Sequence, residues 1–508
     1  MGVWDDRLDR RIGPTGMTAP LPATGRNLTP LSFRLKLGYA AGSIVDGIVQ
    51  QGTNIFLFFY ATAVCGVPGG LAGTALAAGL VVDAIVDPLI GSASDSWRSR
   101  FGRRFPFMAI GLPLVALAFF LIFSLPTGLS PLLLFAWLTT LSVLLRVSTS
   151  LFLLPYNAIG AEISDDYKER SSIMAWRWGA AMIGALIAIV LGFGVFFSGE
   201  GGLSQRSAYA PFAFTLAIVA ILAGIVALRT VLATRDRQHP VAAAGDARLH
   251  NRLFKELGEV FRNRSFRILF VGALLLFTAL AIHSTLGLHA NTFFWRLNAG
   301  QTQMVTLALF GGLLLGAPLA GPLLKRIEKR SVLMLGMGGL GVAYGLPATL
   351  RLQGLLPLHG ASLAAFLSAV VFVAGVLMAM AAIAFASMMA DAADEHEHLF
   401  GARREGLYFA GWAFASKAAA GAGALVAGIA LQAMGFPSGE GATLPTSVAP
   451  ETITWIGIIY GPGSGILTLL SAATCLYYRL DSRAHTAIMA DLDRRRALAL
   501  AGNAAIAP

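Results

Sequence analysis

Twelve long apolar stretches divide this chain and constrain its fold more than any other feature. A helix that spans a bilayer needs roughly 20 predominantly apolar residues. Only 13% of the 508 residues are charged and 56% are hydrophobic, whereas about 25% of residues are charged in soluble domains. We therefore predict an all-α integral membrane protein with twelve transmembrane helices. The expected spans are residues 35–62, 71–94, 105–126, 131–160, 172–198, 209–231, 265–292, 300–324, 331–350, 362–390, 406–434 and 452–478.

The basic residues between these stretches predict the orientation. One set of alternate loops is rich in Lys and Arg, with nine of them between residues 229 and 267. The opposite set contains only Arg206, Arg296 and Arg351. Because Lys and Arg are concentrated in cytoplasmic loops, we expect both termini to be cytoplasmic. The net charge of +11 is then a topology signal rather than a nucleic-acid-binding patch.

The longest polar connection separates the sixth span from the seventh and predicts two halves. A basic segment follows Gly91 (GSASDSWRSRFGRR) and another follows Gly321 (GPLLKRIEKRSVL), at matching places in each half. Two six-helix halves related by a repeat are typical of secondary transporters. The predicted parts are an N-terminal cytoplasmic tail (1–34), a first six-helix half (35–231), a cytoplasmic linker with a surface helix (232–264), a second six-helix half (265–480) and a C-terminal cytoplasmic tail (481–508).

Charged residues inside the predicted spans indicate a functional site. A charge at mid-bilayer costs about 2.5–3.5 kcal/mol on insertion scales, so such residues are usually retained for function. At 1.5 Å of rise per residue, these side chains lie roughly 8–21 Å from the cytoplasmic ends of their spans. Three acids and three bases from five spans could therefore converge near the midplane. They are Asp46, Asp83, Asp87, Arg146, Arg177 and Lys417.

The stretch VVDAIVDPLIG, residues 81–91, places Asp83 and Asp87 four residues apart and so on one helix face. Two neighbouring carboxylates repel unless a cation lies between them or one is protonated. This pattern indicates a Na⁺ or H⁺ site, to which the hydroxyls of Thr149 and Ser150 could contribute. The alternative is a static salt-bridge network with Lys417. The two interpretations are compatible if Lys417 neutralises the acids when the cation is absent.

Other polar and aromatic residues are candidates for substrate binding or gating. Arg146 could anchor an anionic substrate group or pair with Asp46, and His283 could be a packed polar residue or a proton relay. The candidate substrate-binding residues are Asp46, Arg146, Tyr156, Trp176, Arg177 and Trp412, and Asp46, Arg177 and Lys417 form the expected charge network. The candidates for a cytoplasmic gate are Asp95, Arg103, Arg104, Arg403 and Arg404.

Several other chemistries find little support in the sequence. A glycine-rich phosphate-binding loop followed by Lys and Ser or Thr is absent, so we expect neither an ATP-driven motor nor an enzyme. Cys65 and Cys475 lack the spacing of a metal site. The DEHEH segment at 394–398 resembles a metal cluster, but we expect it to lie in a cytoplasmic loop without ligand function. No cofactor is expected apart from a co-transported cation.

Four segments in order resemble the glycoside–pentoside–hexuronide:cation symporters of the major facilitator superfamily, the group of the melibiose permeases. VVDAIVDPLIG is similar to their second-helix cation motif, and DSWRSRFGRRFPF to the loop that follows it. Residues 154–178 resemble their fourth-to-fifth helix segment, where Arg177 matches a functional Arg. Residues 391–417 resemble the segment that ends in a site Lys, here Lys417. The resemblance implies a major facilitator fold and cation-coupled transport by alternating access.

This chain departs from the melibiose pattern at the sugar site. Leu153 and Leu154 precede Pro155 where those permeases carry a sugar-binding acid, and Val86 replaces an Asn between the two cation acids. Asp46 matches the first-helix sugar acid only with a one-residue shift, and Arg146 lies outside the pattern. The resemblance thus implies a sugar, glycoside or uronide as substrate, with a lysophospholipid as the alternative from a related branch. We expect a monomer in a bacterial inner membrane.

Overall fold

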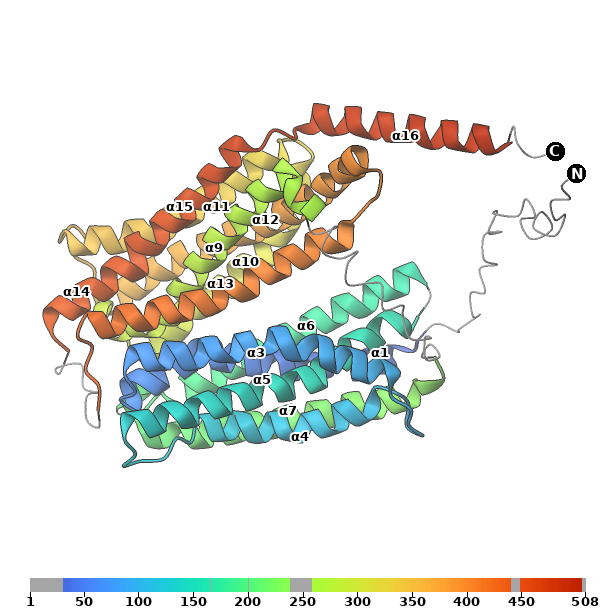
Figure 1. Ribbon diagram of the computed structural model, residues 1–508. Coiled ribbons are helices and arrows are strands. Elements are labelled where there is room, and N and C mark those ends of the chain that lie inside the picture. The colour runs from blue at the N-terminus through green and yellow to red at the C-terminus, as the bar shows by residue number, and fades with distance from the viewer. Residues whose placement is uncertain (1–30, 165, 200, 238–257, 440–447, 505–508) are drawn as a thin grey trace, which may run out of the picture.

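The computed structural model describes residues 31–164, 166–199, 201–237, 258–439 and 448–504, and every regular element within these ranges is a helix. The helices form two bundles that follow each other along the chain (Figure 1). The α-helices of the first bundle are α1 (Phe33–Ala40), α2 (Gly42–Gly52), α3 (Gly69–Ser96), α4 (Phe105–Ile122), α5 (Pro131–Glu162), α6 (Tyr167–Leu191) and α7 (Tyr209–Ala233). Three π-helical turns extend them, namely η1 (Thr53–Leu57) and η2 (Tyr60–Val64) after α2 and η3 (Gly192–Phe196) after α6. The short 3₁₀ turns are η4 (Gly202–Ser204), η5 (Arg206–Ala208) and η6 (Arg235–Arg237).

The second bundle is likewise built mainly of long helices. It contains α9 (Arg264–His289) with η7 (Ala290–Phe294), α10 (Ala299–Leu324), α11 (Lys329–Leu352), α12 (Gly360–Phe400), α13 (Glu405–Ala433), α14 (Pro450–Ile458), η9 (Ile459–Gly463), α15 (Ser464–Thr474) and η10 (Cys475–Tyr477). A final helix, α16 (Ser482–Ala504), follows the bundle.

Eleven helices among the described residues are long and apolar enough to cross a membrane. The expected span 35–62 is absent from these eleven because its helix is interrupted. A turn at Ala41 separates α1 from α2, and two π-helical turns continue α2, so that each piece is short. The stretch is helical nearly throughout, and the polypeptide therefore has apolar helices at all twelve predicted positions.

Local sequence signals determine where several helices begin and end. Ser130 accepts a hydrogen bond from the backbone of Leu133, and Pro131 occupies the first turn of α5. Asn298 and Gln301 form a reciprocal capping box at the start of α10. At the end of α12, Gly401 has a φ of 81°, a conformation that glycine adopts without strain and that stops the helix.

The two bundles are joined at one end of the molecule. There, a single core of buried residues includes Phe56 and Phe59 of the first bundle and Phe293 and Ile456 of the second. Hydrogen bonds also cross at this end, from the Gly70 backbone to Gln432 (3.0 Å), from the Gly439 backbone to Gly66 (3.0 Å), and between Thr62 and His289 (2.8 Å). We call this end the closed end.

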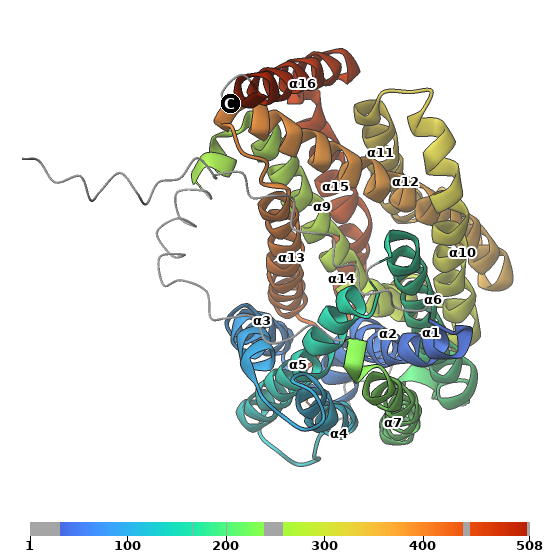
Figure 2. The ribbon, with the colours of Figure 1, turned by 90° about the vertical axis from the view of Figure 1, so that its right-hand side faces the viewer.

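At the opposite end, a second core consists only of residues from the second bundle, such as Met337, Met388 and Tyr408. The start of α1 and the final helix α16 both lie at this end (Figures 1 and 2). We call it the terminal end. The members of the joining core that lie toward the terminal end, such as Leu31, Ile163 and Val231, all belong to the first bundle. Among the described residues, the core shared by both bundles is therefore at the closed end.

One expectation about a polar segment was wrong. Residues 394–398 lie in the last turns of α12 rather than in a loop, because α12 continues ten residues beyond the predicted span end at 390. The predicted C-terminal tail contains helix α16, which packs on α12. Most of the predicted surface helix in the linker lies outside the described residues.

Candidate functional site

The predicted cation-site acids lie on a ladder of contacts between α3 and α5. Asp83 accepts a hydrogen bond from the Arg146 guanidinium at 3.3 Å, and Asp87 accepts one from the Ser150 hydroxyl at 2.6 Å. The two residues of each pair are 63 positions apart in the sequence. Asp87 lies about one turn after Asp83, and Ser150 lies about one turn after Arg146, so the two helices run in the same direction here. One turn earlier, a Cβ added to Gly79 would lie 3.3 Å from Cγ of Arg146. The glycine therefore leaves room for the arginine side chain against α3.

Lys417 reaches this ladder from the second bundle. Its Nζ lies 2.5 Å from Oδ2 of Asp87, while Oδ1 of the same carboxylate accepts the Ser150 hydrogen bond. Charge-assisted hydrogen bonds are among the stronger polar contacts in proteins. The Lys417 side chain is 49% exposed although it contacts the opposite bundle. The space between the bundles beside Asp87 is therefore open enough to expose part of the Lys417 side chain.

All four charged members of the cluster lie near the midpoints of their helices. Asp83 and Asp87 occupy the middle of α3, Arg146 the middle of α5, and Lys417 the middle of α13. Two acids and two bases give a formal charge of zero, which lowers the cost of placing charges at this depth. The cluster has carboxylate and hydroxyl oxygens that suit Na⁺ or a proton, and a movable ammonium group that can replace the cation.

The partner of Arg146 differs from one of the expected alternatives. Arg146 pairs with Asp83 rather than with Asp46. Asp46 lies on α2 and is close enough to Arg177 of α6 for an electrostatic interaction. The α3–α5 ladder brings residue 146 opposite residue 83, whereas α2 packs mainly against α6 and α7.

Arg177 lies in a second polar group within the first bundle. Its guanidinium donates to the side-chain oxygen of Asn157 and lies 4.8 Å from the ring centroid of Tyr156 and 5.9 Å from that of Tyr39. Cation–π contacts at these distances are attractive. Asn157 was absent from the predicted site, although it lies two residues beyond Pro155 in the segment that carries the family resemblance.

The aromatic residues predicted to bind substrate contact other side chains of the protein in this conformation. Tyr156 is fully buried; its hydroxyl contacts the Tyr39 carbonyl (2.7 Å) and Ser43 (3.0 Å), so no surface remains for a substrate. Trp176 packs edge-on against Phe33, and Trp412 against Phe385 and Phe409. Trp412 precedes Lys417 by five residues, which turns it about 140° around the helix axis.

The predicted gate residues form ion pairs within each bundle at the terminal end. Arg104 binds Asp95 at 2.6 Å and Glu162 at 2.8 Å, and Arg103 binds Glu162 at 2.6 Å. Glu162, at the end of α5, was missed by the sequence analysis, although it follows the buried Pro155 segment by only two turns.

In the second bundle, Arg403 binds Asp394 (3.3 Å) and Glu405 (3.2 Å), and Arg404 is the N-cap residue of α13. All the ion pairs of these gate residues described above stay within one bundle. The ion pairs given above for Asp95, Arg103, Arg104 and Arg403 thus connect elements within a bundle at the terminal end.

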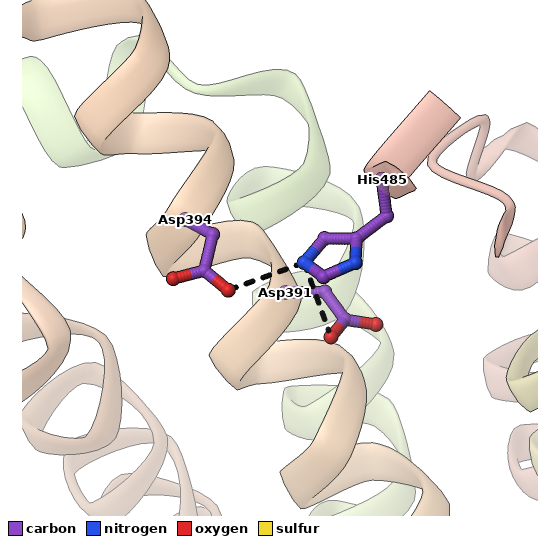
Figure 3. Close-up of side chains that lie close together, drawn as sticks. All are labelled: Asp391, Asp394 and His485. Carbon is purple, nitrogen blue, oxygen red and sulfur yellow. Dashed lines mark hydrogen bonds and ion pairs between the residues drawn. The ribbon is translucent and has the colours of Figure 1, made fainter. Parts of the chain in front are cut away.

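Asp394 of the DEHEH segment belongs to a polar cluster with Asp391 and His485, and their nearest ligand atoms lie within 4.8 Å of one another (Figure 3). The His485 ring nitrogen Nε2 lies 3.1 Å from Asp394. Lys329 also binds Asp391 at 2.7 Å, and Arg403 binds Asp394. The side chains of Lys329 and Arg403 neutralise the two acids. The cluster is therefore better explained as a set of polar contacts that hold α16 against α12 than as a metal site.

His283 is a packed residue of the second bundle. Its ring stacks between Tyr344 (3.7 Å) and Tyr460 (4.0 Å), and Nδ1 lies 3.0 Å from the Tyr460 carbonyl oxygen. The stacking fixes the ring at the centre of α9, α11 and η9. Ring stacking and a hydrogen bond therefore explain how His283 is accommodated inside the second bundle.

The family model that matches this chain and the names of its relatives both describe membrane transporters. Residues 38–482 match the model of the MFS/sugar transport protein family. The chain is 26% identical to the inner membrane symporter YicJ of Escherichia coli over 91% of this chain and 95% of the relative. It is 24% identical to the E. coli glucuronide carrier protein homolog (92% and 96% covered) and 24% identical to the mouse sphingosine-1-phosphate transporter MFSD2B (87% and 88% covered).

Solved structures agree on the fold. The chain superimposes on a bacterial homologue of the iron transporter ferroportin in an inward-facing state with a TM-score of 0.63. The sequence identity is 12%, and the alignment covers 88% of this chain and 98% of the other. This similarity concerns the fold alone.

Proposed function

Because the chain belongs to the MFS/sugar transport protein family, we propose that it couples Na⁺ or H⁺ movement to the transport of a sugar, glycoside or uronide by alternating access. The chain is a multi-pass membrane transporter rather than an enzyme. The specific substrate class and the coupling ion are part of the proposal.

The contact between Asp87 and Lys417 carries this proposal. Asp87 belongs to the first bundle and Lys417 to the second, so their 2.5 Å ion pair links the two bodies that must move. A cation or proton on Asp87 removes the negative charge that holds Lys417. Release of Lys417 would then favour substrate binding, and by linkage the substrate would strengthen cation binding.

The arrangement of the bundles supports alternating access. The bundles share a core at the closed end and lack that core at the terminal end. With the termini in the cytoplasm, as the basic loops indicate, this conformation faces inward. Rocking of the bundles would bring together the gate residues Asp95, Arg103, Arg104, Arg403 and Arg404 at the terminal end.

The substrate assignment is supported by the relatives and by the charges of the site. YicJ is named as a symporter and another relative as a glucuronide carrier homolog. Arg177, with Asn157 beside it and Asp46 nearby, offers donors and an acceptor for sugar hydroxyls or a uronide carboxylate. A lysophospholipid is the second candidate, because the chain is similar over most of its length to a sphingosine-1-phosphate transporter.

A two-step experiment tests this function. The purified protein is first screened for thermal stabilisation by neutral disaccharides, methyl glucuronide and lysophosphatidylcholine. A compound that binds is then offered to proteoliposomes with an imposed Na⁺ or H⁺ gradient. We expect a sugar or uronide to stabilise the protein and to accumulate only with a cation gradient. Stabilisation and gradient-driven movement of the lysolipid alone would favour the second candidate, whereas uptake indifferent to both gradients would contradict coupled symport.

A further inference from the structure

We propose that Arg146 is a built-in counter-ion that takes the place of a coupling cation at Asp83. Asp87 is then the one carboxylate of the pair that exchanges its partner during transport. This inference rests on the proposed cation-coupled function. It assigns Arg146 as the residue that determines how many cations the site accepts.

Arg146 forms an ion pair that stays within the first bundle, with its own side chain 42% exposed. Asp83 is largely buried, with 8% of its side chain exposed, and its carboxylate lies 3.3 Å from the guanidinium. The Arg146 side chain crosses α3 at Gly79, where the missing Cβ leaves space for its methylene groups. A buried carboxylate without a partner would be costly, so the arginine supplies the charge that a bound cation would otherwise provide.

The two acids differ in how their partners are attached. Asp83 and Arg146 lie on α3 and α5, which pack along their lengths in the same bundle. Their pair therefore moves as one body when the bundles rock. The partner of Asp87 lies in the other bundle, so the Asp87–Lys417 pair must lengthen when the bundles rotate. Only Asp87 is then released to bind a cation.

Charge balance gives the consequence. With Arg146 in place, the cluster offers one exchangeable negative charge, which one Na⁺ or one proton neutralises. Without Arg146, two carboxylates on one face would share a single ammonium group, an arrangement that attracts a further cation. Arg146 thus holds the site to one monovalent cation for each transport cycle.

The test measures Na⁺ binding without requiring a known substrate. Purified wild-type, Arg146→Met and Arg146→Gln proteins are unfolded thermally in NaCl or choline chloride at constant ionic strength and alkaline pH. We expect both variants to acquire Na⁺-dependent stabilisation at concentrations about tenfold or more below any wild-type response, since a nearby opposite charge shifts cation or proton affinity by that order. The two variants keep the test usable if one of them is poorly folded.

Two further proteins show whether the gained site is the predicted one. Adding Asp83→Asn to Arg146→Met should abolish the gain. Arg206 lies in the same bundle and donates hydrogen bonds to the backbone carbonyls of Leu125 and Pro126. Arg206→Met therefore removes a positive charge of the first bundle that lies away from Asp83, and it should not create a Na⁺ response. Equal Na⁺ affinity of Arg146→Met, Arg146→Gln and wild type would overturn the inference, as would a gain that survives Asp83→Asn. Failure of the transport proposal would appear separately, as uptake without dependence on any cation gradient.

Discussion

At the scale of single residues, the partners of Asp87 explain why a charge in mid-membrane is tolerated and yet exchangeable. One carboxylate oxygen accepts from the Ser150 hydroxyl and the other from the Lys417 ammonium group. The serine contact lies within one bundle, while the lysine contact crosses to the other. Ser150 therefore keeps Asp87 in place whether or not Lys417 is bound.

Ser150→Ala should weaken cation binding. The substitution removes a hydroxyl oxygen that lies beside Asp87 and can ligate the cation, and a loss of about 1.4 kcal/mol or more of binding free energy would raise the cation concentration for half-maximal stabilisation about tenfold or more. Ser148→Ala is the matched control, since its hydroxyl binds only backbone carbonyls of Leu144 and Leu145 among the described contacts; it should change the value less than about twofold. Equal effects of the two substitutions in a thermal-shift titration would contradict this role.

The sequence allowed the charged residues and the contact of Lys417 with the acid pair to be predicted, but not the partner of Arg146. Their depth and family resemblance singled out Asp83, Asp87 and Lys417. The partner of Arg146 depends on the register between α3 and α5, which is set by packing along both helices rather than by any local pattern. The contacts that bury Tyr156 also come from α1 and α2, far from it in sequence.

At the scale of helices, small residues allow α3 and α13 to approach closely between the bundles. A Cβ added to Gly428 would meet the backbone of Gly69 and would lie 2.9 Å from Cα of Gly73. Small residues at such crossings permit backbone contact between membrane helices. This contact continues from the closed end toward Lys417, which lies on the same helix.

Gly428→Val should destabilise the contact between the bundles. Overpacking a tight contact costs about 1–3 kcal/mol, so thermal unfolding of the purified protein should begin at a lower temperature. Gly338→Val in α11 is the control, because a Cβ there would meet nothing within 4 Å and the change in helix propensity is the same. The proposed close contact would be refuted by a larger loss in Gly338→Val than in Gly428→Val.

Helix positions were largely predictable because an apolar run of membrane length has few other stable folds. Irregularities were not predictable. The π-helical turns η1 and η2 interrupt the first span where Phe56 and Phe59 pack into the common core. α12 extends past its apolar segment because Asp391 and Asp394 form ion pairs with Lys329 and Arg403. α16 packs against α12 through the contact of His485 with Asp394 in the same cluster.

At the scale of the whole molecule, the charges divide into pairs that move together and a pair that must separate. Arg104 with Asp95, Arg403 with Asp394, and Arg146 with Asp83 each stay within one bundle. Lys417 with Asp87 joins the two bundles near the membrane midplane. Among the described residues, one core joins the bundles at the closed end and a second core lies within the second bundle, an arrangement that makes this pair our proposed link between cation binding and bundle rotation.

The most direct measurement compares wild type with Asp87→Asn in proteoliposomes, using the substrate identified by the ligand panel. Gradient-driven accumulation and substrate counterflow without a gradient are recorded for both, with Glu451→Gln, an exposed acid in α14, as the matched control. We predict that wild type and Glu451→Gln accumulate substrate when a cation gradient is imposed. Asp87→Asn should retain counterflow but lose the response to the gradient, because the amide neither binds the cation nor holds Lys417. Accumulation by Asp87→Asn with the wild-type response to the gradient would contradict the account.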